Sequence, residues 1–227
     1  MILTKRRTLL DRVAQSLTLL ESEKGHERIS AEFNNNEDTR KIENRINRAF
    51  LFCLKDYFPE KRYRIFQELP RQPENDTQYD KSEDVRPDLT IIQLADDNSP
   101  DGGIDFHIEC KRLGSPTSSK WKYNEKYVEN GIFRFISDRF YYGVDRENGA
   151  MVGYIEDMEF DDIFKEVNQT IDRHLKIESL VKTTNWRENS TTKLHHKFER
   201  PFKKSPFTLH HFWVDLRGCY PRSQKSA

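Results

Sequence analysis

The sequence predicts an α/β fold in which long helices and short strands form one domain around a single sheet. Apolar residues recur every three or four positions over residues 37–58 and 124–142, which is the period of an amphipathic helix. Runs with the two-residue period of a strand, or short apolar runs, occupy residues 63–69, 89–94, 105–113 and 149–155. The order is helix, three-strand meander, helix and strand, and the final crossover requires a strand parallel to its partner.

A helical extension, residues 1–36, precedes this predicted core, which covers residues 37–155. Apolar residues at helical spacing predict a helix over residues 4–22. That helix either packs on the outside of the core or meets a partner. Residues 21–36 are polar and include three consecutive asparagines, so we expect a loop there.

The chain continues beyond the core with a C-terminal elaboration, residues 156–217, and a polar tail, residues 218–227, that we expect to be flexible. The elaboration carries a helical apolar pattern over residues 160–181 and ends in a strand over residues 207–216. The 227 residues are enough for one sizeable α/β domain or for a core with extensions. We therefore predict a single domain over residues 1–227.

Composition narrows the possible functions. Lys plus Arg and Asp plus Glu are equal at 38 each, so nucleic acid would have to be bound by local basic patches rather than by net charge. The three cysteines are widely spaced, which favours a reducing compartment. With no apolar run of membrane-spanning length and no apparent secretory signal, we expect a cytoplasmic protein without a membrane partner.

An unusual charged face marks the strand predicted at residues 105–113. Alternation places four ionisable residues on one face and apolar residues on the other. The four are Asp105, His107, Glu109 and Lys111. Because the apolar face must pack on the core, we expect the charged face to line a cleft.

A second carboxylate is predicted to lie next to this face. Asp88 begins the strand at residues 89–94, and the turn-rich segment 96–103 links that strand to the next. If the two strands pair as a hairpin, Asp88 comes alongside Glu109. Two such carboxylates repel each other, and a hard cation such as Mg²⁺, which prefers oxygen ligands, relieves the repulsion.

This pattern predicts hydrolysis of a phosphodiester with the help of a divalent metal, which polarises a phosphoryl oxygen and activates water. Lys111 would reach the same cleft and orient the water or stabilise developing negative charge. The alternative is that Glu109 and Lys111 form an ordinary ion pair on a solvated sheet face.

Pro87-Asp88 followed by Glu109-Cys110-Lys111 resembles the signature of the PD-(D/E)xK nuclease superfamily. The resemblance implies a restriction-endonuclease-like core with Asp88, Glu109 and Lys111 as catalytic residues. It also implies Mg²⁺, for which Mn²⁺ would substitute, held by Asp88, Glu109 and the carbonyl of Cys110. Because small proteins of the resembled family often serve in such systems, the resemblance also suggests a DNA-cleaving effector of bacterial phage defence or restriction.

Two further acidic residues are candidates for completing a second metal site. In the resembled family an acidic residue on the helix before the first strand often points into the active site, and Glu43 occupies the matching place. Its alternative role is that of a solvated helical glutamate. Glu68, at the end of the first strand, is the other candidate, although charged residues at strand ends are usually just exposed.

Basic residues outside the motif are candidate contacts to phosphate or DNA. Arg134 is flanked by phenylalanines, so we expect a half-buried guanidinium that contacts phosphate, orients Glu109 or forms a structural salt bridge. The other candidates are Lys120 and Lys122, which alternate with aromatic residues, and Arg200 and Lys203. The pairs His195-His196 and His210-His211 lack acidic or cysteine partners at ligand spacing, which argues against a histidine metal site.

The sequence thus predicts a metal-dependent endonuclease acting on DNA, although phosphate chemistry alone does not distinguish DNA from RNA. The alternative is a catalytically silent nuclease-like subunit that serves a larger complex. A protein partner or a homo-oligomer is possible in either case. An unrelated α/β protein remains an option only if Asp88 and Glu109 lie far apart. The long segment 70–86 could act as a flap.

Overall fold

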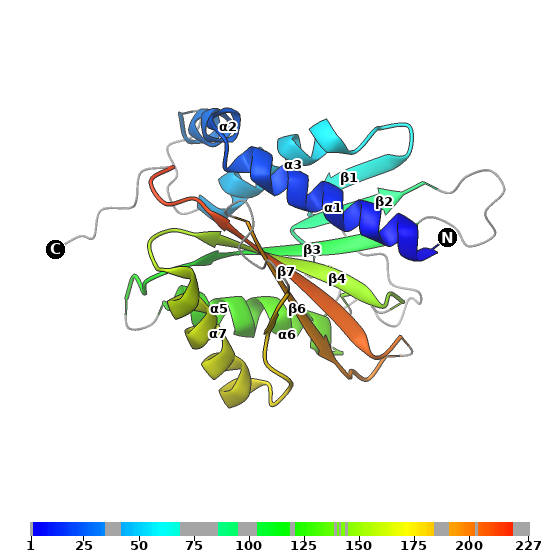
Figure 1. The fold of residues 1–227 in the computed structure, drawn as a ribbon, viewed down its shortest axis with the longest axis vertical. Helices are drawn as coiled ribbons and strands as arrows, with labels where there is room; N and C mark the ends of the chain where they lie inside the picture. Colours follow the sequence, from blue (N-terminus) through cyan, green and yellow to red (C-terminus); the bar gives the residue numbers. More distant parts are fainter. Residues whose placement is uncertain are drawn as a thin grey trace.

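Helices cover both faces of a mixed, mostly antiparallel sheet (Figure 1). The predicted α/β class is therefore confirmed. The computed structural model describes residues 2–34, 42–68, 86–94, 104–118, 121–138, 140, 142–143, 145–183, 191–202 and 204–219.

The sheet has seven strands within these ranges. In spatial order they are β1 (Tyr63–Gln67), β2 (Leu89–Gln93), β3 (Ile104–Leu113), β4 (Asn148–Ile155), β7 (Phe207–Asp215), β6 (Thr192–Phe198) and β5 (Val181–Lys182). The three central strands β3, β4 and β7 run parallel, and all other neighbours are antiparallel. The parallel pairing of β3 with β4 confirms the predicted crossover.

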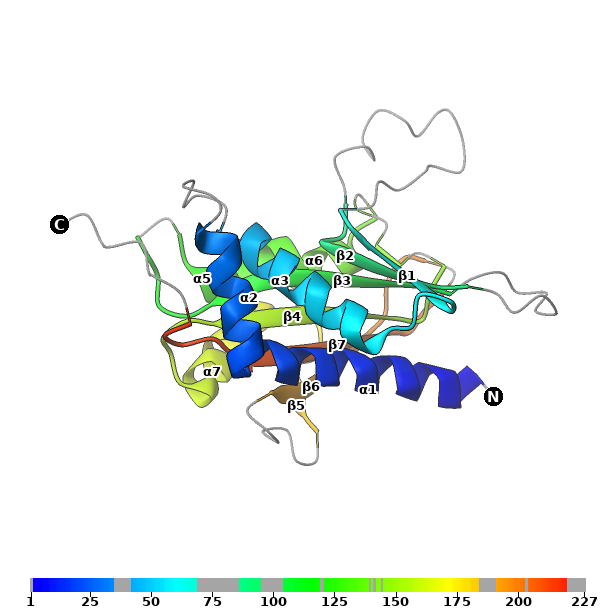
Figure 2. The same cartoon turned by 90° about the horizontal axis from the view of Figure 1, so that it is seen from above.

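One helical layer is formed by α1 (Ile2–Leu20), α2 (Glu23–Asn34) and α3 (Ile42–Tyr57). Figure 2 looks onto this layer and shows α1 and α3 crossing in front of the sheet. The buried stripe of α3, from Ile46 to Leu54, packs into the same apolar cluster as Leu17 of α1 and Ile108 of β3. Burial of this stripe is what holds α3, and hence Glu43 in its first turn, against the sheet.

The prediction of a loop over residues 21–36 was wrong, because α2 occupies most of it. This helix has little apolar surface, but Ile29 is fully buried. Lys24 and Arg28 pair with the Asp56 carboxylate of α3, at 3.0 and 2.9 Å. A helix held by few apolar residues and by charge pairs carries a weak periodic signal, which explains the error.

The opposite layer contains α5 (Tyr123–Tyr127), a π-helical turn (Val128–Ile132), α6 (Phe133–Ile136) and α7 (Phe160–His174). The predicted helix over residues 124–142 therefore ends early, because Ser137 adopts an extended conformation. Gly131 approaches the sheet closely: a Cβ there would lie 2.4 Å from Cε of Met151. The π turn occurs at this approach, as is common near functional sites.

The C-terminal elaboration departs from prediction in two places. The helix expected over residues 160–181 stops at His174, since Lys176 adopts a left-handed φ of 52°. Strand β6 was not predicted. Its buried face includes Thr192 and His196 beside Leu194 and Phe198, and such polar residues weaken an apolar alternation.

Three sequence predictions fall outside the described residues: most of the segment 70–86, the turn at 96–103 and most of the tail 218–227. In the part of the chain that the structure describes, no helix has the length and apolar character needed to cross a bilayer.

Candidate active site

The two carboxylates of the sequence motif lie side by side where β2 begins. Leu89 of β2 pairs with Ile108 of β3, and this antiparallel register brings Asp88 level with Glu109. The backbone N–H of Cys110 donates a hydrogen bond of 2.7 Å to Oδ2 of Asp88, which fixes that carboxylate against β3. The hairpin pairing predicted from the sequence is confirmed.

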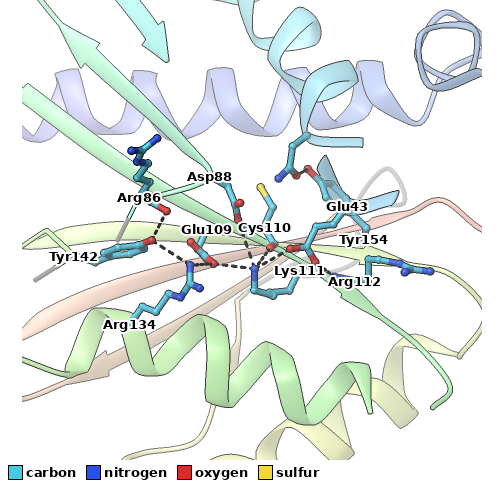
Figure 3. A network of polar contacts seen from close by, with 11 residues as sticks. Glu43, Arg86, Asp88, Glu109, Cys110, Lys111, Arg112, Arg134, Tyr142 and Tyr154 are labelled. Carbon is cyan, nitrogen blue, oxygen red and sulfur yellow. Dashed lines mark hydrogen bonds and ion pairs between the residues drawn. The ribbon is translucent and has the colours of Figure 1, made fainter. Parts of the chain in front are cut away.

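The Lys111 ammonium lies at the centre of the cluster (Figure 3). Its Nζ is 2.8 Å from Oε1 of Glu109, 2.9 Å from Oε1 of Glu43 and 3.7 Å from Oδ2 of Asp88. It also donates a 2.7 Å hydrogen bond to the carbonyl of Cys110. Because both distances are measured to the same nitrogen, the oxygens of Asp88 and Glu109 must lie less than about 8 Å from each other. A larger separation would prevent the two carboxylates from sharing one cation.

Glu43 reaches the cluster from the layer of α1, α2 and α3, in the first turn of α3. Its Oε1 faces Lys111, and its Oε2 accepts a 3.3 Å hydrogen bond from the backbone N–H of Arg112. Glu43 thus points into the site. Glu68, the other acidic candidate, is exposed after β1 and donates its backbone N–H to the carbonyl of Asp88 at 3.1 Å.

Glu109 is the most deeply buried member, with a side chain that is 0% exposed. Its Oε1 binds both Lys111 and Arg134, at 2.8 and 2.7 Å. Its Oε2 is buried and has no hydrogen-bond partner within the described residues. Burial, together with the charge of Asp88, raises the pKa of Glu109 to about 7, although Lys111 and Arg134 oppose the shift.

Lys111 remains a cation in this environment. Burial lowers its pKa, but the negative charges of Glu109, Asp88 and Glu43 outweigh burial and hold the pKa well above its usual value. A lysine in that state cannot accept a proton from water. It can donate hydrogen bonds to a water or to a phosphate oxygen that gains charge.

Arg134 lies where sequence analysis expected it, half-buried on α6 and bound to Glu109. Its guanidinium also donates a 3.2 Å hydrogen bond to the hydroxyl of Tyr142. Tyr142 was missed as a site residue, because it was assigned to the end of a helix. The aromatic pair Tyr141-Tyr142 before Gly143 carries no signal that could have identified a contact to Arg134.

The donor set suits a hard divalent cation. Asp88, Glu109, Glu43 and the carbonyl of Cys110 supply oxygens, the ligand type that Mg²⁺ prefers. Oε2 of Glu109 is a buried acceptor for which the described part of the chain supplies no hydrogen-bond donor. No group of three or more acidic, His or Cys side chains in the described ranges already has the spacing of a formed metal site, because the carboxylates converge on the Lys111 ammonium.

The predicted phosphate contacts in the basic patches receive little support. Lys122 pairs with Glu125 of α5 at 2.9 Å, and Trp121 beside it is 51% exposed. Lys120 and Lys203 lie outside the described residues.

Arg200 is buried, and its geometry does not fit a phosphate contact. It donates hydrogen bonds to backbone carbonyls from all three guanidinium nitrogens. The acceptors are the carbonyls of Phe135, Tyr142, Gly143, Arg146 and Lys204. The prediction of a DNA contact at Arg200 is therefore corrected to a structural role.

Within each histidine pair, the two side chains lie on opposite faces of the sheet. His195 of β6 lies opposite His210 of β7, while His196 and His211 are buried on the other face with ring centroids 5.8 Å apart. Burial lowers the pKa of His196 to about 4 and that of His211 well below its usual value. Both are therefore neutral at pH 7.

Comparisons of this chain with protein-family models, with curated proteins and with solved structures found no match.

Proposed function

We propose that this protein is a metal-dependent nuclease that hydrolyses phosphodiester bonds in DNA. The observation that carries the proposal is the convergence of Asp88, Glu109 and Glu43 on one point, where Glu109 keeps a buried oxygen that has no hydrogen-bond partner among the described residues. Burying carboxylates beside one another costs free energy, and a cation-dependent reaction gives such an arrangement a use.

The arrangement of elements supports the same proposal. Helix α3, strands β1 to β3, the helical segment α5–α6 and the parallel strand β4 follow the order implied by the restriction-endonuclease-like resemblance. The motif residues Asp88 and Glu109 lie on adjacent strands of that unit. A part in phage defence stays a prediction that rests on the resemblance alone.

In the proposed site Mg²⁺ would be held by Asp88, Glu109 and the carbonyl of Cys110, with Glu43 beside them. Bound there, it would polarise a phosphoryl oxygen and lower the pKa of a water. Lys111 donates hydrogen bonds to that water or to the phosphate oxygen on which charge develops. Arg134 holds Oε1 of Glu109, which leaves Oε2 of that carboxylate available.

The proposal is tested by cleavage of supercoiled, linear and single-stranded DNA and of RNA, with Mg²⁺ or Mn²⁺. We expect cutting of DNA that requires the metal and is lost in Glu109→Gln. Lys111→Met should slow it by about 10²–10³-fold, the usual effect of losing one donor to a developing charge.

The matched controls are Glu129→Gln and Lys126→Met, which remove the partners of a surface ion pair of 2.8 Å on the neighbouring helix. These variants should cut like wild type. Metal-independent cutting, or full activity in Glu109→Gln, would contradict the proposal. Cleavage of RNA in preference to DNA would redirect it to a ribonuclease.

A further inference from the structure

Arg200, in the C-terminal elaboration, binds the backbone of a turn between α6 and β4. We call these contacts of Arg200 the clamp. Arg200 donates hydrogen bonds to the carbonyls of Tyr142 at 3.0 Å and of Gly143 and Arg146 at 2.5 Å each. Its guanidinium lies over the Phe207 ring, 3.8 Å from the ring centroid. One side chain from outside the predicted nuclease core therefore holds the backbone of this turn.

Strand β3 holds the same turn from the other side. The backbone N–H of Gly143 donates a 3.1 Å hydrogen bond to Nδ1 of His107, which lies on the same face of β3 as Glu109. Gly143 has a φ of 58°, a conformation that favours glycine. The Tyr142 ring meets the edges of His107 and Phe135, with centroids 6.1 and 5.4 Å apart. Tyr142 is thus fixed in position, and its side chain is 1% exposed.

The hydroxyl of Tyr142 bonds both the segment that leads to Asp88 and the arginine that binds Glu109 (Figure 3). It donates a 2.5 Å hydrogen bond to the carbonyl of Arg86, two residues before Asp88. It accepts a 3.2 Å hydrogen bond from Arg134, which in turn binds Glu109 at 2.7 Å. One oxygen therefore connects the backbone that leads to Asp88 with the side chain that orients Glu109.

We propose that Tyr142, held by Arg200, is a positioning residue that sets the placement of Asp88 relative to Glu109. This inference rests on the proposed function, since it assigns Tyr142 to the same metal site. Groups that orient ligands without touching the metal typically change metal affinity or activity by about 10–100-fold when they are lost. The C-terminal elaboration would then be part of the active site's support rather than an independent addition.

The test is the affinity for Mn²⁺, measured by calorimetry on the full chain, for wild type and Tyr142→Phe. The substitution keeps the ring packing and removes the hydroxyl with its two hydrogen bonds. We expect Mn²⁺ to bind about 10–100-fold more weakly. The Mg²⁺ concentration for half-maximal cleavage should rise in parallel, with KM for DNA unchanged.

Tyr127→Phe is the matched control. Tyr127 of α5 is also fully buried, and its hydroxyl contacts Nδ1 of His211 at 2.7 Å and Nε1 of Trp213 at 3.1 Å. It should bind Mn²⁺ like wild type even if its thermal stability falls. Wild-type affinity in Tyr142→Phe, or equal weakening in both variants, would overturn the positioning role.

Arg200→Lys tests the clamp itself. Lysine keeps the charge but has three donors instead of five, so the turn loses part of its support. We expect an affinity between those of wild type and Tyr142→Phe, and little further loss when the two changes are combined. Fully additive losses would overturn the role of Arg200, and if this variant does not fold, Tyr142→Phe still decides the inference. Failure of wild type to bind Mn²⁺ would instead overturn the proposed function, and the inference with it.

Discussion

Two clusters of buried polar side chains lie in this fold, and they differ in charge and access. The carboxylate cluster combines Glu109, which is 0% exposed, with Asp88 and Lys111, which are 13% and 12% exposed. The histidine cluster of β6 and β7 contains His196 and His211, both 0% exposed and packed among aromatic rings. Each cluster also contains a buried nitrogen or oxygen without a hydrogen-bond partner among the described residues.

The difference separates a candidate site from an ordinary core. The carboxylate cluster brings acidic groups together with cations, because Lys111 and Arg134 bind Glu109, and Glu43 beside them is 29% exposed, so that a ligand can approach. The histidines are neutral, because burial, with a smaller contribution from the neighbouring histidines, lowers their pKa values. Buried neutral side chains such as these histidines thus indicate ordinary core packing. Buried groups of opposite charge that remain partly accessible to solvent indicate a candidate active site.

The largest expected effect follows from changing one member of each cluster. Asp88→Asn should reduce metal-dependent cleavage by more than about 100-fold, because loss of a group that merely supports a ligand already costs about 10–100-fold. His196→Gln, which keeps a donor for the carbonyl of Glu178, should leave activity per folded molecule unchanged. Equal losses of activity in Asp88→Asn and His196→Gln would contradict the assignment of the carboxylate cluster, and not the histidine cluster, to the active site.

Arg134→Lys tests whether the geometry of the Arg134 guanidinium, and not only its charge, supports metal binding by the carboxylate cluster. Lysine preserves the charge but cannot reproduce the geometry that contacts both Glu109 and Tyr142. We expect the metal affinity to fall by about 10–100-fold with little change in folding. Titration of Mn²⁺ into both proteins measures this, and an unchanged affinity would reduce Arg134 to a structural ion pair.

The buried histidines should make the free energy of unfolding depend on pH in the acidic range. Below the unfolded-state pKa of 6.5 the unfolded chain binds a proton at His196, whereas the folded chain does not until its pKa of about 4. Stability is therefore lost as the pH falls through this interval, by about 1.4 kcal/mol per pH unit for each such histidine.

Urea unfolding of wild type and His196→Gln across this range isolates the contribution of one histidine. The wild type should lose stability relative to the variant as the solution becomes more acidic. Parallel pH profiles for the two proteins would show that His196 already titrates normally in the folded state.

The smallest expected effect is that of a substitution at a surface ion pair. Lys122→Ala removes a partly exposed ion pair with Glu125 and should change the free energy of unfolding by no more than about 0.5 kcal/mol. Cleavage at moderate salt should change little. A loss of DNA affinity with a smaller salt dependence would instead restore Lys122 to the predicted DNA-binding surface.

Where apolar periodicity is strong, the sequence predicted the elements well. The strands around Ile91 and Ile108 and the stripe of α3 all appear where expected, because burial of their side chains dominates local structure. Prediction failed where other forces dominate. Ion pairs to Asp56 support α2, and polar residues such as Thr192 fill buried positions of β6.

The candidate site shows the same limit. Asp88, Glu109 and Lys111 could be found because spacing along two paired strands places them together. Tyr142 and the clamp by Arg200 could not, since they depend on contacts between segments that are 58 residues apart in the chain. A guanidinium that binds backbone carbonyls has no sequence pattern, which is why Arg200 was mistaken for a DNA contact.

The central claim is that the carboxylate cluster holds a divalent metal, and calorimetric titration of Mn²⁺ into the full chain tests it most directly. The account predicts saturable binding to wild type that is lost in Glu109→Gln and strongly weakened in Asp88→Asn. Binding should persist in His196→Gln. Absence of binding to wild type, or equal affinity in all four proteins, would contradict the account.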